Sequence, residues 1–344
     1  MSKSIFITGC CGYIGSHTTV DLLSKDYNVI GLDNFSNSSK EVLNGIKKIS
    51  KKEIIFYEGD ARDENIINNI FSKHKIDLVI DFAAFKSVGD SNNRPLEYYD
   101  NNVVSMLNVL KCMKKFGVFS FIFSSSATVY GENNKMPVNE KSRIGKTKNP
   151  YGTSKLISEY ILKDLYNSSP NWNICIFRYF NPVGAHKSKL IGEDINGVPS
   201  NLMPRIIYNI DNPGDIITIF GTDYDTNDGT GVRDFIHIQD LSRAHVNATE
   251  LMLRQKKGYR IYNLGTGQGY SVLELIDTFQ RVNNVKINYK FGDRRVGDVA
   301  KCYADVRLAE KELCWKAIYS LEDMCIDSYN YYNFNNSKAE IERK

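Results

Sequence analysis

The chain has 344 residues, of which 42% are hydrophobic and 24% charged, a composition typical of a globular protein larger than one average domain. Its formal net charge is only +4, which argues against a nucleic acid or an anionic membrane as partner. No apolar run approaches the roughly 20 residues of a membrane span. The seven cysteines form no CxxC pair, which indicates reduced thiols and a cytoplasmic location rather than a disulfide scaffold.

The first predicted strand covers residues 4–8 and leads directly into Gly9, Gly12 and Gly15. A helix is predicted from about residue 16 to residue 25. Glycines spaced GxxGxxG between a strand and a helix are typical of a dinucleotide-binding turn, where they allow a tight bend and close approach of the backbone to a pyrophosphate. The N–H groups that open the helix add donors for the phosphates. We therefore expect a dinucleotide at this loop.

A second strand over residues 28–32 ends in Asp33, 18 residues after Gly15. A carboxylate there can bind both ribose hydroxyls of adenosine and would repel a 2′-phosphate. No arginine follows within the next three residues. The sequence therefore predicts NAD rather than NADP. After a third strand, Asp60 could face the adenine or cap a helix, and the two roles are compatible.

Strand and helix signals alternate through the first 180 residues. Further strands are predicted at 54–57, 77–82, 119–123 and 174–178, with a long helix over 95–115. Ala83 and Ala84 follow one strand, and their small side chains would let a cofactor lie close to the sheet edge. This order predicts an α/β fold with a doubly wound parallel sheet of the Rossmann type.

Tyr151 and Lys155 open an apolar helical run and share one helix face, since residues four apart are neighbours on a helix. A nearby ammonium favours the phenolate, so Tyr151 could accept a proton at neutral pH. The alternative is a pair on a solvated helix face. Ser126 follows a strand, at the sheet edge where ligands bind. If Ser126, Tyr151 and Lys155 converge, they predict alcohol–ketone redox chemistry with a nicotinamide.

The rest of the chain is less regular. We expect residues 1–180 to form the NAD-binding domain and residues 181–344 mainly a smaller α/β substrate-binding lobe. A segment at about 234–266 is expected to pack back on the large domain. The polar tail after Tyr332 predicts a frayed end.

Together these motifs resemble the extended short-chain dehydrogenase/reductase family, and within it the epimerases of UDP-sugars. The stretches that carry the resemblance cover nearly the whole chain: 12–17, 95–102, 123–131, 178–186 and 228–237. The resemblance implies NAD held as a prosthetic group and interconversion of UDP-glucose and UDP-galactose, in galactose metabolism. It also implies a homodimer that pairs helices near 95–115 and 150–168, where Met106, Leu110 and Ile161 could serve either that seam or the core.

The resemblance implies three sets of site residues. The catalytic residues would be Ser126, Tyr151 and Lys155. The NAD-binding residues would be Gly9, Gly12, Tyr13, Ile14, Gly15, Asp33, Asn34, Asp60, Ala61, Phe82, Ala83, Ala84, Lys86, Asn101, Ser124, Tyr151, Lys155 and Tyr179. The substrate-binding residues would be Lys86, Ser126, Tyr151, Phe180, Asn181, Asn201, Leu202, Phe220, Arg233, Arg295, Asp298 and Cys302. Taken singly, Asn181 could be a loop cap, Phe220 a core residue and either arginine a solvated charge.

Other functions on this fold stay open. Family members that dehydrate sugar nucleotides need an acid or base just after the catalytic serine, where this chain has Ala127 and Thr128. A different sugar-nucleotide epimerase is an alternative, and a non-enzymatic NAD-binding protein is another. At Cys302 some epimerases carry a bulky tyrosine, so the smaller side chain predicts room for the acetamido group of UDP-N-acetylglucosamine or UDP-N-acetylgalactosamine; alternatively it only packs. The histidines show no metal-ligand spacing, and no metal is predicted.

Overall fold

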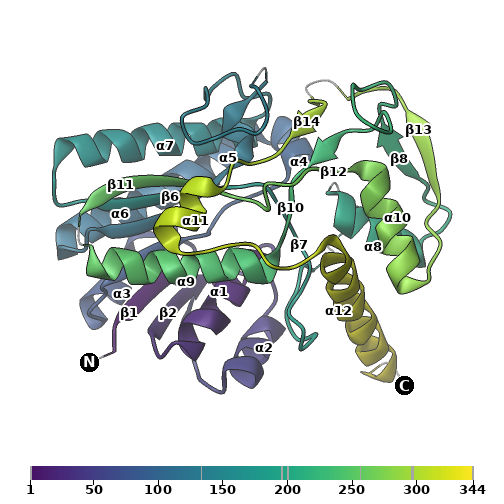
Figure 1. Cartoon of the computed structure of the whole chain (residues 1–344). Coiled ribbons are helices and arrows are strands. Elements are labelled where there is room, and N and C mark those ends of the chain that lie inside the picture. Colours follow the sequence, from purple (N-terminus) through teal and green to yellow (C-terminus); the bar gives the residue numbers. More distant parts are fainter. Residues whose placement is uncertain are drawn as a thin grey trace.

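The computed structural model describes residues 2–132, 134–194, 197–199, 201–255, 257–295 and 298–342. Its main feature is a seven-stranded parallel sheet in the order β11-β6-β5-β4-β1-β2-β3 (Figure 1). The strands are β1 Ser4–Thr8, β2 Asn28–Asp33, β3 Ile55–Glu58, β4 Leu78–Asp81, β5 Ser120–Ser126, β6 Asn173–Tyr179 and β11 Gly258–Leu264. The predicted doubly wound parallel sheet is confirmed.

Helices cover both faces of this sheet, because alternate residues of each strand point to opposite sides and both sets are apolar. One hydrophobic cluster joins the sheet to α1 Tyr13–Ser24, α2 Glu41–Ser50, α9 Ile238–Arg254 and α11 Arg307–Leu313. The other joins it to α3 Glu64–Lys73, α6 Ser105–Phe116 and α7 Pro150–Ser168. In Figure 1, α9 lies alongside α1, although more than 200 residues separate them.

The helix predicted over 95–115 is divided into three parts. After α4 Val88–Asn93, the chain forms α5 Pro95–Tyr99, a π-helical turn η1 Asp100–Val104 and then α6. In the same region, Met106 and Leu110 are 0% and 5% exposed within the core, so they do not line an outer seam. Ile161 packs partly buried against the same cluster.

A smaller group of elements lies to one side of the large sheet (Figure 1). Its strand pairs are β7 Asn181–Val183 with β10 Phe235–His237, and β8 Ile217–Phe220 with β13 Tyr289–Gly292. Three short strands form a further sheet: β9 Val232–Arg233, β12 Tyr270–Ser271 and β14 Lys301–Cys302. The helices here are α8 Leu202–Asp211, α10 Val272–Asn283 and α12 Leu321–Glu342. The tail after Tyr332, expected to fray, continues α12.

None of the helices in the described part of the chain is long and apolar enough to cross a membrane.

Candidate active site

The glycine loop joins β1 to α1 at the carboxyl edge of the sheet. Gly9 has φ +68°, a left-handed conformation that favours glycine. A Cβ on Gly15 would lie 2.1 Å from the carbonyl oxygen of Gly9, so a side chain cannot fit between helix and loop. Gly12 is the N-cap of α1, and its backbone N–H donates to the same Gly9 oxygen at 3.2 Å. The helix begins at Tyr13, earlier than predicted, so its first N–H groups face the loop that would hold a pyrophosphate.

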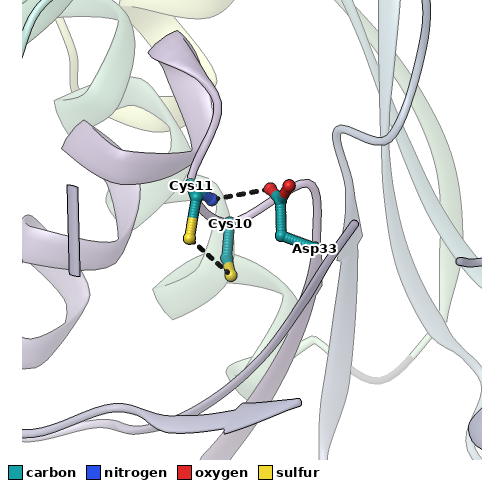
Figure 2. A group of neighbouring side chains, drawn as sticks. All are labelled: Cys10, Cys11 and Asp33. Atoms are coloured by element: carbon teal, nitrogen blue, oxygen red, sulfur yellow. Dashed lines mark hydrogen bonds between the residues drawn. The ribbon is translucent and has the colours of Figure 1, made fainter. Parts of the chain in front are cut away.

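Asp33 fixes the shape of this loop from the end of β2 (Figure 2). Its carboxylate accepts hydrogen bonds from the backbone N–H groups of Cys11 and Phe35, each at 2.9 Å, and from the Ser38 hydroxyl at 2.9 Å. The Cys10 and Cys11 sulfurs lie 3.8 Å apart and are buried. The two thiols and the Asp33 carboxylate come within 4.8 Å of one another, a donor group that the sequence did not predict. The loop and this carboxylate fit an adenosine diphosphate.

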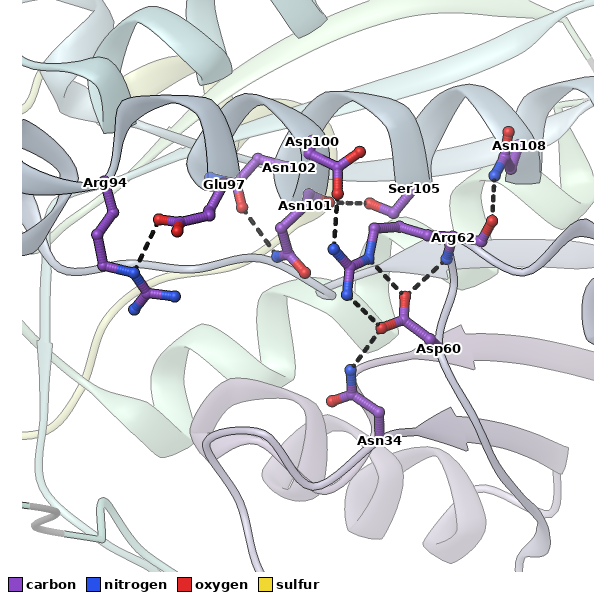
Figure 3. Close-up of polar contacts among 10 residues, drawn as sticks. All are labelled: Asn34, Asp60, Arg62, Arg94, Glu97, Asp100, Asn101, Asn102, Ser105 and Asn108. Carbon is purple, nitrogen blue, oxygen red and sulfur yellow. Dashed lines mark hydrogen bonds and ion pairs between the residues drawn. The ribbon is translucent and has the colours of Figure 1, made fainter.

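Asp60 lies two residues after the end of β3, beside Asn34, in the network that Figure 3 shows. Its carboxylate accepts from Arg62 at 2.7 Å and from the Asn34 side chain at 3.0 Å, while Arg62 also pairs with Asp100 at 2.6 Å. The hydrogen bond from Arg62 lowers the pKa of Asp60 to about 2. Asp60 does not cap α3: that role belongs to Asp63, which accepts from the Asn65 N–H.

The π-helical turn brings two asparagines into the site region. Asn101 and Asn102 are 9% and 2% exposed, and the Asn101 side chain donates to that of Asn102 at 3.1 Å. Asn102 in turn donates to the Ser154 hydroxyl on α7 at 3.1 Å and binds both backbone groups of Phe85. A π turn contains one residue more than an α-helical turn, so the burial of these asparagines does not follow the 3.6-residue pattern from which the helix was predicted. Asn102 therefore ties the start of α7 to the loop after β4.

Ser126, Tyr151 and Lys155 lie together at the carboxyl end of β5. The Asn149 side chain caps α7 by accepting from the Gly152 N–H at 2.8 Å, and Pro150 occupies the first turn. Tyr151 lies beside Ser126, close enough for the serine side chain to act on the pKa of the phenol. The Lys155 ammonium is 5.0 Å from the centre of the Phe123 ring, and this side chain is buried.

The electrostatics of this trio differ from the expected ones. Burial raises the pKa of Tyr151 above its usual value, and the neighbouring Ser126 side chain opposes this rise. Lys155 was expected to lower the pKa of Tyr151, but desolvation acts on both groups. Burial lowers the pKa of Lys155 to about 8, and the Asp81 carboxylate opposes this fall. Burial therefore favours the uncharged form of both side chains, the phenol of Tyr151 and the amine of Lys155.

A buried ion pair holds α7 against the sheet one turn beyond Lys155. The Glu159 carboxylate accepts from Arg178 Nε at 3.0 Å and Nη2 at 2.6 Å, and from the Ser125 hydroxyl at 2.6 Å. Arg178 also donates to the Tyr130 hydroxyl at 3.1 Å. Sequence reasoning missed this pair, although an arginine in an otherwise apolar strand was a usable signal.

The remaining predicted cofactor residues lie on β6 and in the segments that follow β1, β3 and β4. The Tyr179 hydroxyl is 2.6 Å from His245 Nε2, and the nearby Ser124 side chain acts to lower the pKa of Tyr179 against the rise that burial causes. The Lys86 ammonium pairs with Glu193 at 2.5 Å and lies 5.5 Å from the centre of the Tyr13 ring. Phe82, Ala83 and Ala84 form the loop after β4, while Ala61 follows Asp60 and Ile14 lies in the first turn of α1.

Two predicted arginines of the smaller group each have a partner. Arg295 stacks its guanidinium 3.9 Å from the centre of the Phe220 ring, at the end of β8. Arg233 donates to the backbone oxygens of Val232 and Val299, each at 2.9 Å, and lies 3.6 Å from the Asp298 carboxylate. Arg233 is half-buried, whereas Arg295 is exposed apart from its contact with the Phe220 ring. The Phe220 ring, only partly buried, presents its face to a cation rather than filling the core.

The other predicted substrate residues lie on nearby segments. Asn201 is the N-cap of α8 and Leu202 its first residue, and Asn181 opens β7 beside Phe180. Cys302 ends β14, in register with Arg233, and packs partly buried against a cluster that includes Phe180. Burial raises the pKa of the Cys302 thiol. Both readings of Cys302, as pocket wall and as packing residue, are compatible with this position.

The sheet with its glycine turn and the Ser-Tyr-Lys trio define an extended short-chain dehydrogenase/reductase. A family model described as GDP-mannose 4,6 dehydratase matches residues 6–328. The curated UDP-glucose 4-epimerase of Pasteurella multocida (strain Pm70) is 48% identical over 96% of this chain and 98% of its own. The chain belongs to the UDP-glucose 4-epimerase family.

Solved structures agree with this assignment. The UDP-glucose 4-epimerase from Bifidobacterium longum, in complex with NAD+ and UDP, is 47% identical with a TM-score of 0.93 and covers 97% of this chain and 99% of its own. The UDP-Glc/GlcNAc 4-epimerase from Campylobacter jejuni is 34% identical with a TM-score of 0.84, covering 97% of this chain and 100% of its own.

Proposed function

We propose that this protein interconverts UDP-glucose and UDP-galactose by inverting carbon 4 of the sugar, with NAD as its cofactor. The observation that carries the proposal is that Ser126 and Tyr151 lie beside each other, with Lys155 one turn on, at the sheet edge beside the glycine loop. Relatives that are nearly half identical over almost the full chain and named as UDP-glucose 4-epimerases support it.

The residues proposed for NAD would hold it along this edge. The glycine loop would accommodate the diphosphate, Asp33 the adenosine ribose, and Lys155 the ribose at the nicotinamide end. When bound, NAD supplies a hydride acceptor and donor at carbon 4. Tyr151 takes the proton of the sugar 4-hydroxyl and later returns one, while Ser126 holds the same oxygen.

The smaller group of elements supplies the residues that hold the UDP part of the substrate. Arg233 and Arg295 bind the diphosphate, since a planar guanidinium can contact two of its oxygens. Phe220 and Asp298 border the nucleoside, together with Asn201 and the backbone of Leu202. An anchored diphosphate lets the 4-keto sugar turn about its link and present the other face without leaving. The division into residues 1–180 and 181–344, with about 234–266 returning to the large domain, matches these two tasks.

Epimerisation is favoured over dehydration by the residues that follow Ser126. Ser126 is followed by Ala127 and Thr128 in a short 3₁₀ helix over Ala127–Tyr130, and neither side chain can act as the acid or base that a dehydratase needs. Acetamido sugars are a further proposed substrate class, because Cys302 is small and only partly buried. One structural relative is named for both UDP-Glc and UDP-GlcNAc.

We also propose a cytoplasmic homodimer. The exposed apolar side chains that would form its seam are Leu96, Val104 and Tyr160, which are 81%, 39% and 51% exposed on α5, η1 and α7. They replace the buried Met106 and Leu110 in that role. Sedimentation velocity should give twice the chain mass, and a monomer at micromolar concentration would overturn this part.

The decisive test is to incubate the purified protein with UDP-galactose without added cofactor and to separate the products. UDP-glucose should appear, and Tyr151→Phe should reduce its rate by about 10²–10⁴-fold because the proton acceptor is lost. Absence of UDP-glucose even with added NAD, together with unchanged UDP-N-acetylgalactosamine, would overturn the proposal.

A further inference from the structure

Asp81 is a buried carboxyl group that the chemistry above does not use. It is the last residue of β4 and is 3% exposed. Its strand lies between β1 and β5, at the point where the order of strands along the sheet reverses. Ligands of doubly wound sheets bind at this switch point. A charge placed there acts on whatever binds at the edge.

The register of the strands shows which face Asp81 occupies. Asp81 pairs with Thr8 on β1 and with Phe123 on β5, and paired residues of parallel strands point to the same side. The Thr8 hydroxyl donates to the Asp81 carboxylate at 2.5 Å. Two residues earlier on the same face, Val79 packs in the cluster that includes Leu162 of α7. The carboxylate therefore lies on the face that α7 covers.

Lys155 comes to this face from α7. Its ammonium lies 5.0 Å from the centre of the ring of Phe123, the register partner of Asp81. The two charges act on each other in both directions. Burial lowers the pKa of Lys155 to about 8 against the pull of Asp81, and burial raises the pKa of Asp81 to about 6 against the pull of Lys155 and the Thr8 hydrogen bond.

We propose that Asp81 is a positioning residue whose carboxylate keeps Lys155 protonated in its desolvated site, so that the ammonium remains available beside Tyr151. Removing water disfavours a buried ammonium, and an opposite charge nearby restores it. The proposal rests on the role given to Lys155 in the proposed function. A neutral lysine could neither favour the phenolate of Tyr151 nor bind the cofactor ribose as a cation.

The other groups around the pair are neutral or more weakly coupled. Among the described residues, Asp81 is the carboxylate that acts on the pKa of Lys155. Thr8 of β1 donates to Asp81, and both Asp81 and Tyr151 of α7 act on the pKa of Tyr179 of β6, whose hydroxyl bonds His245 of α9. Burial lowers the pKa of His245 to about 4 and raises that of Tyr179, so both are uncharged near neutral pH.

A purely structural role for Asp81 makes a different prediction. The Thr8 hydroxyl also accepts from the Ala83 N–H at 3.3 Å, so the Thr8–Asp81 contact supports the loop after β4. If that support were its whole role, Asp81→Asn would lower stability and leave the titration of Lys155 unchanged. The electrostatic role predicts instead that Asp81→Asn shifts the titration of Lys155.

The test compares wild type, Asp81→Asn and Asp21→Asn. Asp21 is a matched control in the same domain: its pKa is also raised by burial, and it accepts from the Ser242 hydroxyl at 2.5 Å, on the opposite face of the sheet. Lys155 is titrated by brief acetylation at a series of pH values, with mass spectrometry of its peptide. The pH dependence of kcat for UDP-galactose is measured on the same proteins.

In Asp81→Asn, the pH of half-maximal acetylation and the alkaline limb of kcat should both move down by roughly one pH unit or more, the usual effect of a close opposite charge. Asp21→Asn should change neither. If Asp81→Asn does not fold, Thr8→Val serves instead: it raises the pKa of Asp81 and should shift Lys155 in the same direction by less. An acetylation midpoint unchanged in both variants would overturn the proposal. If the wild-type protein failed to convert UDP-galactose, the proposed function would be overturned. The acetylation midpoints would still show whether Asp81 keeps Lys155 protonated.

Discussion

Replacing Glu159 with glutamine should destabilise the protein far more than loss of an exposed ion pair does. The Glu159 and Arg178 side chains are both 2% exposed, and three hydrogen bonds of 2.6–3.0 Å end on the carboxylate. Glutamine keeps the shape but turns an amide NH₂ toward the guanidinium, which leaves a buried cation without a counter-charge. Breaking a buried pair costs about 3–5 kcal/mol. For a chain of 344 residues, with an unfolding entropy of about 2.1 cal/mol/K per residue, that corresponds to a fall in Tm of roughly 4–7 °C.

The measurement is thermal unfolding followed by circular dichroism. Glu64→Gln is the matched control, since Glu64 pairs with Lys111 at 3.2 Å with both side chains more than half exposed, and its Tm should change little. The double variant Glu159→Leu with Arg178→Met should recover much of the loss, because both buried charges are removed together. A Tm for Glu159→Gln equal to that of Glu64→Gln would refute the reasoning.

Three further predictions follow from the site and the core. Gly15→Ala should purify without NAD, as judged by absorbance after denaturation, because its Cβ would lie 2.1 Å from the Gly9 oxygen; Gly89→Ala, whose Cβ meets nothing within 4 Å, should retain it. Cys302→Tyr should lower activity on UDP-N-acetylgalactosamine relative to UDP-galactose by roughly 10–200-fold, and an unchanged ratio would refute the pocket role. Burial lowers the pKa of His17 from 6.5 to about 3, so the unfolded chain takes up a proton first as the pH falls below 6.5. The stability that neutral His17 contributes is complete above that pH and is lost toward pH 3, at about 1.4 kcal/mol per unit. In urea titrations at a series of pH values, the stability of His17→Gln should fall less steeply between pH 6.5 and pH 3 than that of wild type. An equal slope of stability against pH would contradict the lowered pKa of His17.

The part of the fold that the sequence predicts well rests on local patterns. The short apolar strands, the glycine turn and Asp33 at the end of β2 are each readable within about ten residues, and they lie where expected. The cap of α7 is equally local, since Asn149 and Pro150 precede Tyr151. Such features depend on backbone geometry and hydrogen bonding between near neighbours, which the residue types largely determine.

The features that escaped prediction depend on contacts between distant segments. The π turn at Asn101 is set by what its side chains meet, and α12 by the core that its apolar residues enter. The pKa of Tyr151 was expected to fall because spacing shows Lys155 nearby, while burial, which spacing does not show, acts more strongly. Asp81 could not be matched with Lys155 because 73 residues separate them, and only the register of β4 and β5 brings them to one face.

The last strand to join the large sheet has a consequence for synthesis on the ribosome. β11 covers the outer edge of β6, a strand with every residue buried, but it lies 78 residues further along the chain. At about 5–20 residues per second, the nascent protein would carry that open edge for roughly 4–16 s. An uncovered strand edge can pair with another chain. Newly made copies on neighbouring ribosomes are therefore the partners most exposed to mispairing, and a chaperone that binds extended strands would find its target at residues 173–179.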